Sequence, residues 1–245
     1  MTAAVVGIVG AGAVGQTLAA GLVAAALPGR LLVASRQLDQ ARALAADLQD
    51  LAHAARSRTQ VEAGGVGDLH GCDAVVIALR TAFENTAEHD IRRGGAAANA
   101  PALGDLAQSL RGFGGIVLVV TNPVDLMARR FAEVSGCARV FGIGSNLDSA
   151  RYRLLLAGRA GVDPELVHGH VIGEHGDRAV ICASTTTVNG GPVSISVRTI
   201  VHELQQRPAL IAVTGRAAAL APAGRHGPRA ALSASARAPL GCGCM

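Results

Sequence analysis

The chain has 245 residues, half of them hydrophobic and only 2% aromatic, so it can form one large domain or two modest ones with cores of aliphatic side chains. All 22 basic residues are Arg; 17 of them and all 18 acidic residues lie before residue 205, which gives residues 1–204 a net charge of −1. The positive charge belongs to the C-terminal end, so the body of the chain is not predicted to bind nucleic acid.

Short apolar segments alternate with helical segments over the first 143 residues. Strands are predicted at residues 4–9, 31–34, 74–79, 116–120 and 139–143, and helices at residues 14–26, 38–55, 99–111 and 124–135. The strands lack polar alternation, which is typical of a parallel sheet covered by helices on both faces. Residues 1–143 are therefore predicted to form an α/β domain with a doubly wound parallel sheet.

The pattern changes after residue 143. A helix is predicted at residues 147–160 and another at 198–206, with strands at residues 167–172, 179–188 and 193–197 between them. Residues 144–214 are thus expected to form a shortened α+β domain. Residues 215–245 are rich in Ala, Arg, Gly, Pro and Ser without apolar periodicity, which predicts disorder. Two origins stay open for this tail, a functional Arg-rich segment and non-native or out-of-frame sequence, and we favour the second.

The sequence offers no sign of a membrane segment or of a metal site. No apolar run reaches the roughly 18–20 residues that a membrane span needs. The apolar start lacks a basic segment and leads directly into a glycine motif, which is typical of a strand and not of a signal peptide. Cys72, Cys137 and Cys182 stand singly among apolar residues, as buried reduced thiols do. We expect a cytoplasmic protein without a membrane partner or a metal ion.

The first motif that points to chemistry is Gly-Ala-Gly-Ala-Val-Gly at residues 10–15, between a predicted strand and a predicted helix. Gly10 permits a tight turn, Gly12 lets a pyrophosphate approach the backbone, and Gly15 permits close packing of helix and strand. The helix N-terminus, from Ala13 and Val14 onward, supplies amide donors to the phosphates. The motif predicts a dinucleotide cofactor, NAD or NADP.

The end of the second predicted strand bears on the choice of cofactor. An NAD-binding protein usually places an acidic residue there, against the ribose 2′-hydroxyl, but this chain has Ser35 and Arg36. Ser35 cannot repel a 2′-phosphate and Arg36 could pair with one, which favours NADP slightly. The alternative is that Arg36 is merely a solvated side chain.

Three further motifs follow along the chain. Thr121-Asn122 leads into Pro-Val-Asp after a predicted strand, where a doubly wound sheet binds its ligand, although Asn-Pro is often only a turn. Asp148 and Arg151 share one helix face, as a surface ion pair would also do. His175 lies in a Gly-Glu-His-Gly-Asp loop from which it could transfer protons in a cleft; it could equally be a loop residue without a role.

Taken together with Gly-Ile-Gly-Ser-Asn-Leu-Asp-Ser-Ala-Arg at residues 142–151, these motifs resemble those of the lactate/malate dehydrogenase family. The resemblance covers roughly residues 4–204. It implies a Rossmann-type domain followed by a shortened α+β catalytic domain, and a homo-oligomer. It also implies that His175 is the acid/base and that Asp148 orients it, and that the substrate is bound by Arg151, Asn122 and Arg92. Asn99, seven residues after Arg92, would contact the cofactor, as would Thr121 and Asn122. The adjacent Arg93 competes with Arg92 for its role.

The resemblance implies reversible oxidation of a small (S)-2-hydroxy acid to the 2-oxo acid with NAD(P). No Arg stands between residues 81 and 91, where malate-specific members hold a second carboxylate, so lactate is favoured although His89 offers some positive charge. The segments with which family members complete the pocket are absent or replaced after residue 215. A catalytically inactive dinucleotide-binding protein therefore stays open as an alternative. An unrelated NADP-dependent reductase is the other, but it leaves His175 and the Asp148–Arg151 pair unexplained.

Overall fold

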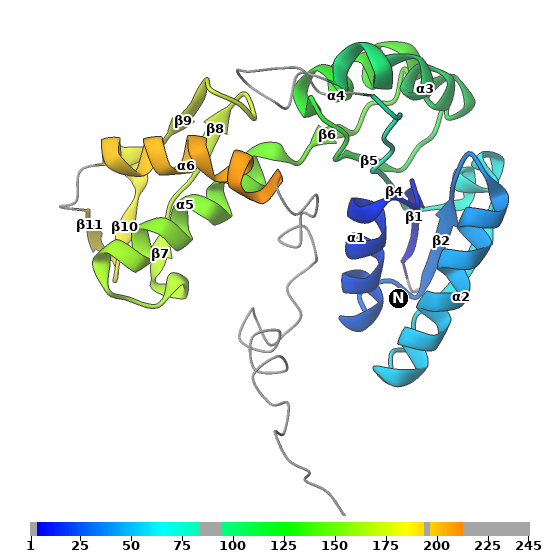
Figure 1. Ribbon diagram of the computed structural model, residues 1–245, viewed down its shortest axis with the longest axis horizontal. Helices are drawn as coiled ribbons and strands as arrows, with labels where there is room; N and C mark the ends of the chain where they lie inside the picture. Colours follow the sequence, from blue (N-terminus) through cyan, green and yellow to red (C-terminus); the bar gives the residue numbers. More distant parts are fainter. Residues whose placement is uncertain (1–3, 84–94, 194–196, 213–245) are drawn as a thin grey trace, which may run out of the picture.

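The computed structural model describes residues 4–83, 95–193 and 197–212 of the chain. These residues form two lobes, which Figure 1 shows beside each other, joined through the short strand β6 and helix α5. The larger lobe contains a sheet and its covering helices. The smaller lobe contains two long helices and several short strands.

The sheet of the larger lobe has six parallel strands in the order β3-β2-β1-β4-β5-β6. Its strands are Val5–Val9 (β1), Arg30–Ala34 (β2), Gln60–Gly64 (β3), Ala74–Ile77 (β4), Ile116–Val119 (β5) and Val140–Gly142 (β6). The sheet extends from β1 to β3 on one side and from β4 to β6 on the other, so the strand order reverses between β1 and β4. A doubly wound sheet binds its ligands beside this reversal, at the carboxyl ends of the strands. The predicted Rossmann-type sheet is therefore confirmed.

Helices cover both faces of this sheet. One face bears α1 (Ala13–Ala24) and α2 (Leu38–Ala54), and the other bears α3 (Ala96–Ser109), α4 (Val124–Ser135) and the short 3-10 helix η1 (Val66–Gly71). Adjacent strand residues point to opposite faces, so Ile8 packs with the α1/α2 layer while Val9 packs with the α3/α4 layer. Both positions are buried, which explains why the strands are apolar throughout.

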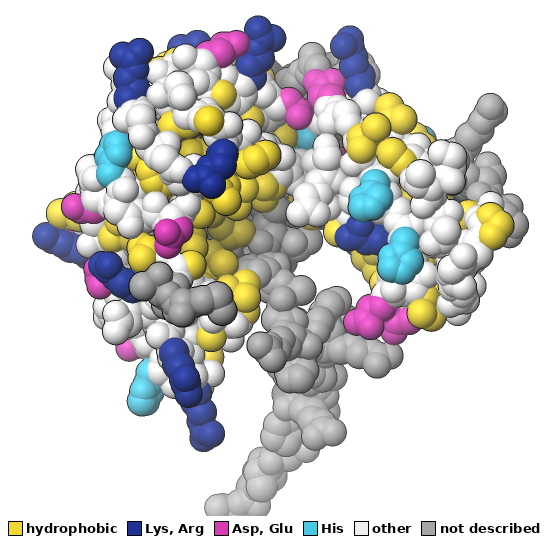
Figure 2. Space-filling view, turned by 180° about the vertical axis from the view of Figure 1, so that it is seen from behind, with side chains coloured by type: hydrophobic (Ala, Val, Ile, Leu, Met, Phe, Trp, Pro, Cys, Tyr) yellow, Lys and Arg dark blue, Asp and Glu magenta, His cyan; other side chains and the backbone are white. Residues whose placement is uncertain are grey.

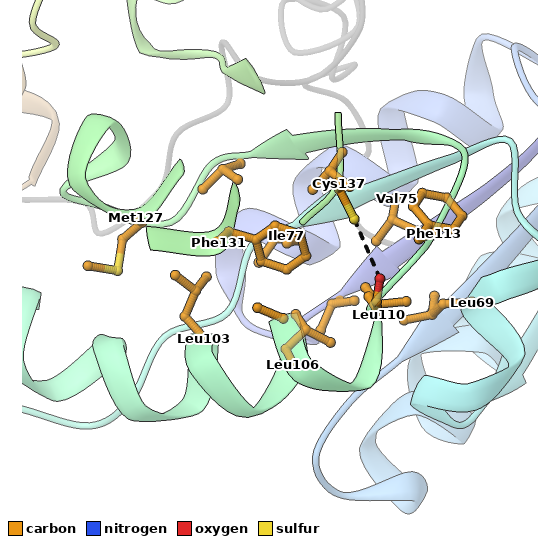
Figure 3. Packing of buried hydrophobic residues seen from close by; sticks show 14 of the residues in the cluster. Leu69, Val75, Ile77, Leu103, Leu106, Leu110, Phe113, Met127, Phe131 and Cys137 are labelled. Atoms are coloured by element: carbon orange, nitrogen blue, oxygen red, sulfur yellow. Dashed lines mark hydrogen bonds between the residues drawn. The ribbon is translucent and has the colours of Figure 1, made fainter. Parts of the chain in front are cut away.

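Figure 3 shows the cluster between the sheet and helices α3 and α4. Leu103, Leu110 and Phe131 are fully buried in it, and the Cys137 thiol donates a hydrogen bond to the Leu110 carbonyl at 3.4 Å. Burial also raises the pKa of the Cys72 thiol in the same cluster, so this thiol stays protonated and unreactive.

The smaller lobe is built on two helices, α5 (Gly144–Ala160) and α6 (Val197–Ala212). Its strands are Val167–His168 (β7), Val171–Gly173 (β8), Ala179–Ile181 (β9), Thr187–Val188 (β10) and Gly191–Pro192 (β11), with 3-10 turns Pro164–Leu166 (η3) and Ala183–Thr185 (η4). They pair as β11-β10-β7 and β8-β9. Tyr152 and Leu156 of α5 pack against Ile200 and Leu204 of α6 in a core of their own.

Two of the predicted strands in this lobe are interrupted. Residues 167–172 divide into β7 and β8 of different sheets, and between them Gly169 lies against the Tyr152 ring with no room for a side chain. Residues 179–188 divide at η4, where the hydroxyls of Thr185 and Thr186 donate to the Cys182 carbonyl. Such side chain to backbone bonds compete with strand pairing, which periodicity alone does not reveal.

Other boundaries also differ from the prediction. Strand β3 was not expected; it is an edge strand whose Gln60 and Glu62 are exposed. The predicted strand at 193–197 falls mostly on residues 194–196, which lie outside the described residues; on either side of them, β11 ends at Pro192 and α6 begins at Val197. The predicted disorder at residues 215–245 also falls outside them.

Figure 2 shows the surface of both lobes from behind. Arg side chains stand singly over the larger lobe on this face, and apolar side chains are visible between them. Among the described residues, no helix has the length and apolar character that crossing a membrane requires. The same residues contain no group of three His, Cys, Asp or Glu side chains that could hold a metal ion.

We predict that Leu103→Ala lowers the free energy of unfolding by about 2–5 kcal/mol, because it leaves a cavity between α3 and the sheet. Urea denaturation measures the change. Leu126→Ala on α4, where the side chain is 50% exposed, serves as the control and should cost less than about 1 kcal/mol. Equal losses in the two variants would contradict the burial of Leu103 in this core.

Candidate active site

The glycine turn lies between β1 and α1, at the carboxyl edge of the sheet. Gly10 has a φ of 113°, and a Cβ there would lie 2.5 Å from the Ala78 carbonyl oxygen. A Cβ on Gly15 would overlap the Gly10 carbonyl. Gly12 is different, because no atom lies within 4 Å of the position its Cβ would take. The turn therefore has two glycines that the fold requires and one beside open space at a helix N-terminus.

This geometry fits a dinucleotide phosphate. Gly12 is the N-cap of α1, and both Gly12 and Ala13 are exposed while Val14 is half-buried. Amide N–H groups of the first helical turn have no partner within the helix, and they attract anions. The open approach at Gly12 lets a pyrophosphate reach them.

Ser35 and Arg36 directly follow β2, at the same edge of the sheet. The Ser35 hydroxyl donates to the Gln40 side-chain oxygen at 3.2 Å, and the Arg36 side chain is exposed. The structure thus leaves the Arg36 guanidinium accessible to an anionic ligand.

The Asn99 side chain of α3 links the backbone segments that follow β4 and β5. Its side-chain oxygen accepts a hydrogen bond from the Thr81 amide at 2.8 Å, and its side-chain nitrogen donates to the Asn122 carbonyl at 3.0 Å. Thr121 is buried and donates to the Leu79 carbonyl at 2.9 Å. Asn99 and Thr121, predicted as cofactor contacts, thereby hold the backbone that presents the exposed side chain of Asn122.

Asp148 contacts two other predicted site residues, His175 and Arg151. Its Oδ2 lies 2.5 Å from His175 Nδ1, and its Oδ1 lies 3.4 Å from Arg151 Nη1. The side chains of all three are at least 92% buried. Their sequence positions span 27 residues, so the contact depends on the folding of α5 against the β8–β9 hairpin.

Apolar side chains stand next to this carboxylate. A small hollow beside Asp148 is lined by Ile181 of β9 and by Val201 and Leu204 of α6. Because such surroundings screen charges poorly, the electrostatic interactions of Asp148 are stronger here than they would be in water.

Gly144, the first residue of α5, is the close neighbour of His175. A Cβ at this position would overlap Cβ and Cγ of His175. The imidazole can therefore lie against the start of α5 only because residue 144 has no side chain. The sequence analysis missed this role, although Gly144 stands within the segment 142–151 that it singled out.

The sequence analysis also missed three polar contacts around the His175 loop. The Asp125 carboxylate accepts a hydrogen bond from the His175 amide, and the Ser145 hydroxyl donates to the Gly173 carbonyl. The Ser149 hydroxyl accepts from the Val171 amide and so ties α5 to β8. The only sequence signal for these contacts was that the polar residues lie in the first turns of helices that follow strands. Arg92, predicted to contact the substrate, lies outside the described residues.

Sequence profiles of one family match both lobes. The profile of the lactate/malate dehydrogenase NAD binding domain matches residues 4–142, and that of the lactate/malate dehydrogenase alpha/beta C-terminal domain matches residues 145–234. The second match extends past residue 214, at which the sequence analysis ended the α+β domain; that limit stays a prediction.

Individual proteins agree with the profiles. The chain is 38% identical over 193 residues to the L-lactate dehydrogenase of Deinococcus radiodurans, covering 77% of this chain and 62% of that protein. It is 34% identical over 190 residues to an L-lactate dehydrogenase of Lactococcus lactis subsp. cremoris, covering 76% and 60%. The chain thus spans about three fifths of the length of the curated relatives it matches.

A solved structure shares the fold. The lactate dehydrogenase from Cryptosporidium parvum, complexed with lactic acid and β-nicotinamide adenine dinucleotide, superposes with a TM-score of 0.73 at 25% identity. The superposition covers 84% of this chain and 66% of that chain. The profile of the NAD binding domain alone matches more than half of the residues of the present chain. This chain therefore belongs to the lactate/malate dehydrogenase family.

Proposed function

We propose that this chain transfers a hydride between a nicotinamide dinucleotide and a small (S)-2-hydroxy acid, with L-lactate preferred and malate as the second choice. The observation that carries the proposal is the buried cluster of His175, Asp148 and Arg151 in the smaller lobe, together with a glycine turn in the larger lobe that is open to a dinucleotide phosphate. The matched relatives are L-lactate dehydrogenases, which supports lactate.

The cluster supplies the acid/base group that the reaction needs. Asp148 accepts a hydrogen bond from Nδ1 of His175, so the neutral imidazole carries its proton on Nδ1. Its other nitrogen, Nε2, is then free to act as the base. In lactate oxidation Nε2 takes the hydroxyl proton while the C–H hydrogen leaves with its electron pair. In pyruvate reduction the imidazolium returns that proton to the carbonyl oxygen. Asp148 stabilises the imidazolium in both directions.

Two further side chains would orient the substrate. Arg151 is proposed to bind the substrate carboxylate through two parallel hydrogen bonds, a geometry that Lys cannot provide. Asn122, which lies just after β5, would contact the substrate near the nicotinamide. Holding the substrate at both points aligns its C–H bond for transfer.

Gly12, Ala13 and Val14 would receive the pyrophosphate of the cofactor at the start of α1, where no atom blocks the approach at Gly12. When bound there, the cofactor would supply the hydride acceptor or donor of the reaction at its nicotinamide C4. The exposed Arg36 would pair with a 2′-phosphate, so we propose that the chain accepts NADP as well as NAD, with NADP slightly preferred.

Two further proposals rest on the family resemblance alone. They are that Arg92 polarises the substrate carbonyl and that the chain assembles into a homo-oligomer. A cytoplasmic location is proposed from the free thiols of Cys72, Cys137 and Cys182.

His175→Asn should lower pyruvate-dependent oxidation of NADH or NADPH by about 10²–10⁴-fold, because it removes the proton-transferring group. The assay follows the absorbance of the reduced cofactor, with pyruvate and oxaloacetate compared. His53→Asn, on the exposed face of α2, is the matched control and should retain full turnover. Wild-type protein that binds NADH but turns over neither acid would instead favour the inactive dinucleotide-binding protein.

Arg36→Ala should weaken NADPH binding about two- to fivefold and leave NADH binding unchanged, since only NADPH carries the 2′-phosphate. Fluorescence titration with each reduced cofactor measures the two dissociation constants. Arg129→Ala removes another exposed Arg, on α4, and should alter neither constant. The proposed NADP preference fails if Arg36→Ala leaves NADPH binding unchanged.

Gly144→Ala should lower turnover by about 100-fold, because the new Cβ forces His175 out of position. Gly158→Ala, on the same helix, meets no atom within 4 Å and should raise stability by about 0.5–1 kcal/mol without affecting turnover. Urea denaturation run beside the activity assay separates displacement of His175 from unfolding. Equal turnover in the two variants would argue against the packing of His175 on α5.

A further inference from the structure

The His175 backbone is held by a residue of the other lobe. The amide N–H of His175 donates to Oδ2 of Asp125 at 2.8 Å. Asp125 is the second residue of α4, 50 positions earlier in the chain, and α4 packs on the dinucleotide-binding sheet. The loop that presents the imidazole is therefore attached to the lobe that would bind the cofactor.

The same loop is attached on its other side to α5. The Ser145 hydroxyl donates to the carbonyl of Gly173 at 3.0 Å, two residues before His175. Gly173 has a φ of 87°, a backbone conformation that side chains disfavour, so the chain turns sharply at this point. Together the two bonds fix the backbone on either side of Glu174.

Asp148 alone does not fix the position of the imidazole. A hydrogen bond at Nδ1 orients the ring, but the distance from Nε2 to a substrate also depends on where Cα of His175 lies. The bond from Asp125 supplies that second restraint, and it is charge-assisted because its acceptor is a carboxylate.

Asp125 also stands three residues after Asn122. Asn122 lies three residues after the end of β5, Asp125 lies in the first turn of α4, and the Asn122 carbonyl accepts a hydrogen bond from Asn99. One short segment thus presents Asn122 and anchors His175. A displacement of α4 would move both groups together.

We propose that Asp125 is a positioning residue: its carboxylate holds the His175 backbone at a set distance from Asn122, so that proton transfer and substrate contact stay aligned. This inference rests on the proposed dehydrogenase function. Asp125 touches neither substrate nor cofactor in this role and acts through the His175 amide.

Steady-state kinetics of Asp125→Ala, Asp125→Asn and Asp39→Ala test the role. Asp125→Ala should lower kcat about 10- to 100-fold while the KM for pyruvate changes less than about threefold, because misplacement of the base affects the chemical step. Asp125→Asn keeps an oxygen acceptor and should recover most of the lost kcat.

Asp39→Ala is the matched control. Asp39 is likewise the second residue of its helix, α2, and it forms an ion pair with the exposed Arg42. Its removal therefore takes away a negative charge at a helix N-terminus, as Asp125→Ala does, but leaves the His175 loop untouched. It should leave kcat unchanged. A kcat of Asp125→Ala within twofold of wild type, or an Asn variant as impaired as the Ala variant, would overturn the proposal.

Amide hydrogen exchange at His175, measured by NMR, provides a readout that needs no turnover. The His175 N–H should exchange about tenfold faster or more in Asp125→Ala, since its acceptor is lost, but not in Asp39→Ala or Asp125→Asn. If the wild-type chain lacks dehydrogenase activity, this experiment still decides whether Asp125 anchors the loop. Unchanged exchange in Asp125→Ala would refute the anchor.

Discussion

The structure around the site depends on one buried carboxylate. Taking Asp148 out of water is costly unless hydrogen bonds and opposite charge compensate, and His175 and Arg151 are the partners that the structure supplies. His175 belongs to a loop and the other two to a helix. The fold of the smaller lobe therefore has to bring the β8–β9 hairpin onto α5, and the Ser149 bond to Val171 secures that contact.

The two lobes contribute different parts of the chemistry. The sheet of the larger lobe directs the ends of β1, β4 and β5 to one edge, where backbone groups of Gly12 and the side chain of Asn122 are accessible. The smaller lobe contributes groups that would act on the substrate. The hydrogen bond from the His175 amide to Asp125 joins the lobes, so the loop that carries His175 is attached to α4 of the larger lobe as well as to α5.

Much of this arrangement could be predicted from local signals. Uniformly apolar strands and a glycine turn were sufficient to predict the doubly wound sheet, because both reflect burial and backbone sterics. Strand β3 was not predicted because an edge strand needs no continuous apolar run. The break before Thr187 was not predicted because it depends on Thr hydroxyls that donate hydrogen bonds to a backbone carbonyl. The contacts of Gly144 and Asp125 with His175 join segments 31 and 50 positions apart, and a single sequence does not show which distant residues meet.

Only Ile143 separates strand β6 from helix α5. Its amide N–H is bonded to the Val119 carbonyl of β5, so the junction belongs to the sheet on one side and to the helix on the other. Each residue of an α-helix advances the azimuth by about 100°. One residue more or fewer at this junction would rotate Asp148 away from the hairpin that carries its partner. The one-residue length of the junction thus sets the direction in which Asp148 leaves the α5 axis, whatever side chain stands at the junction.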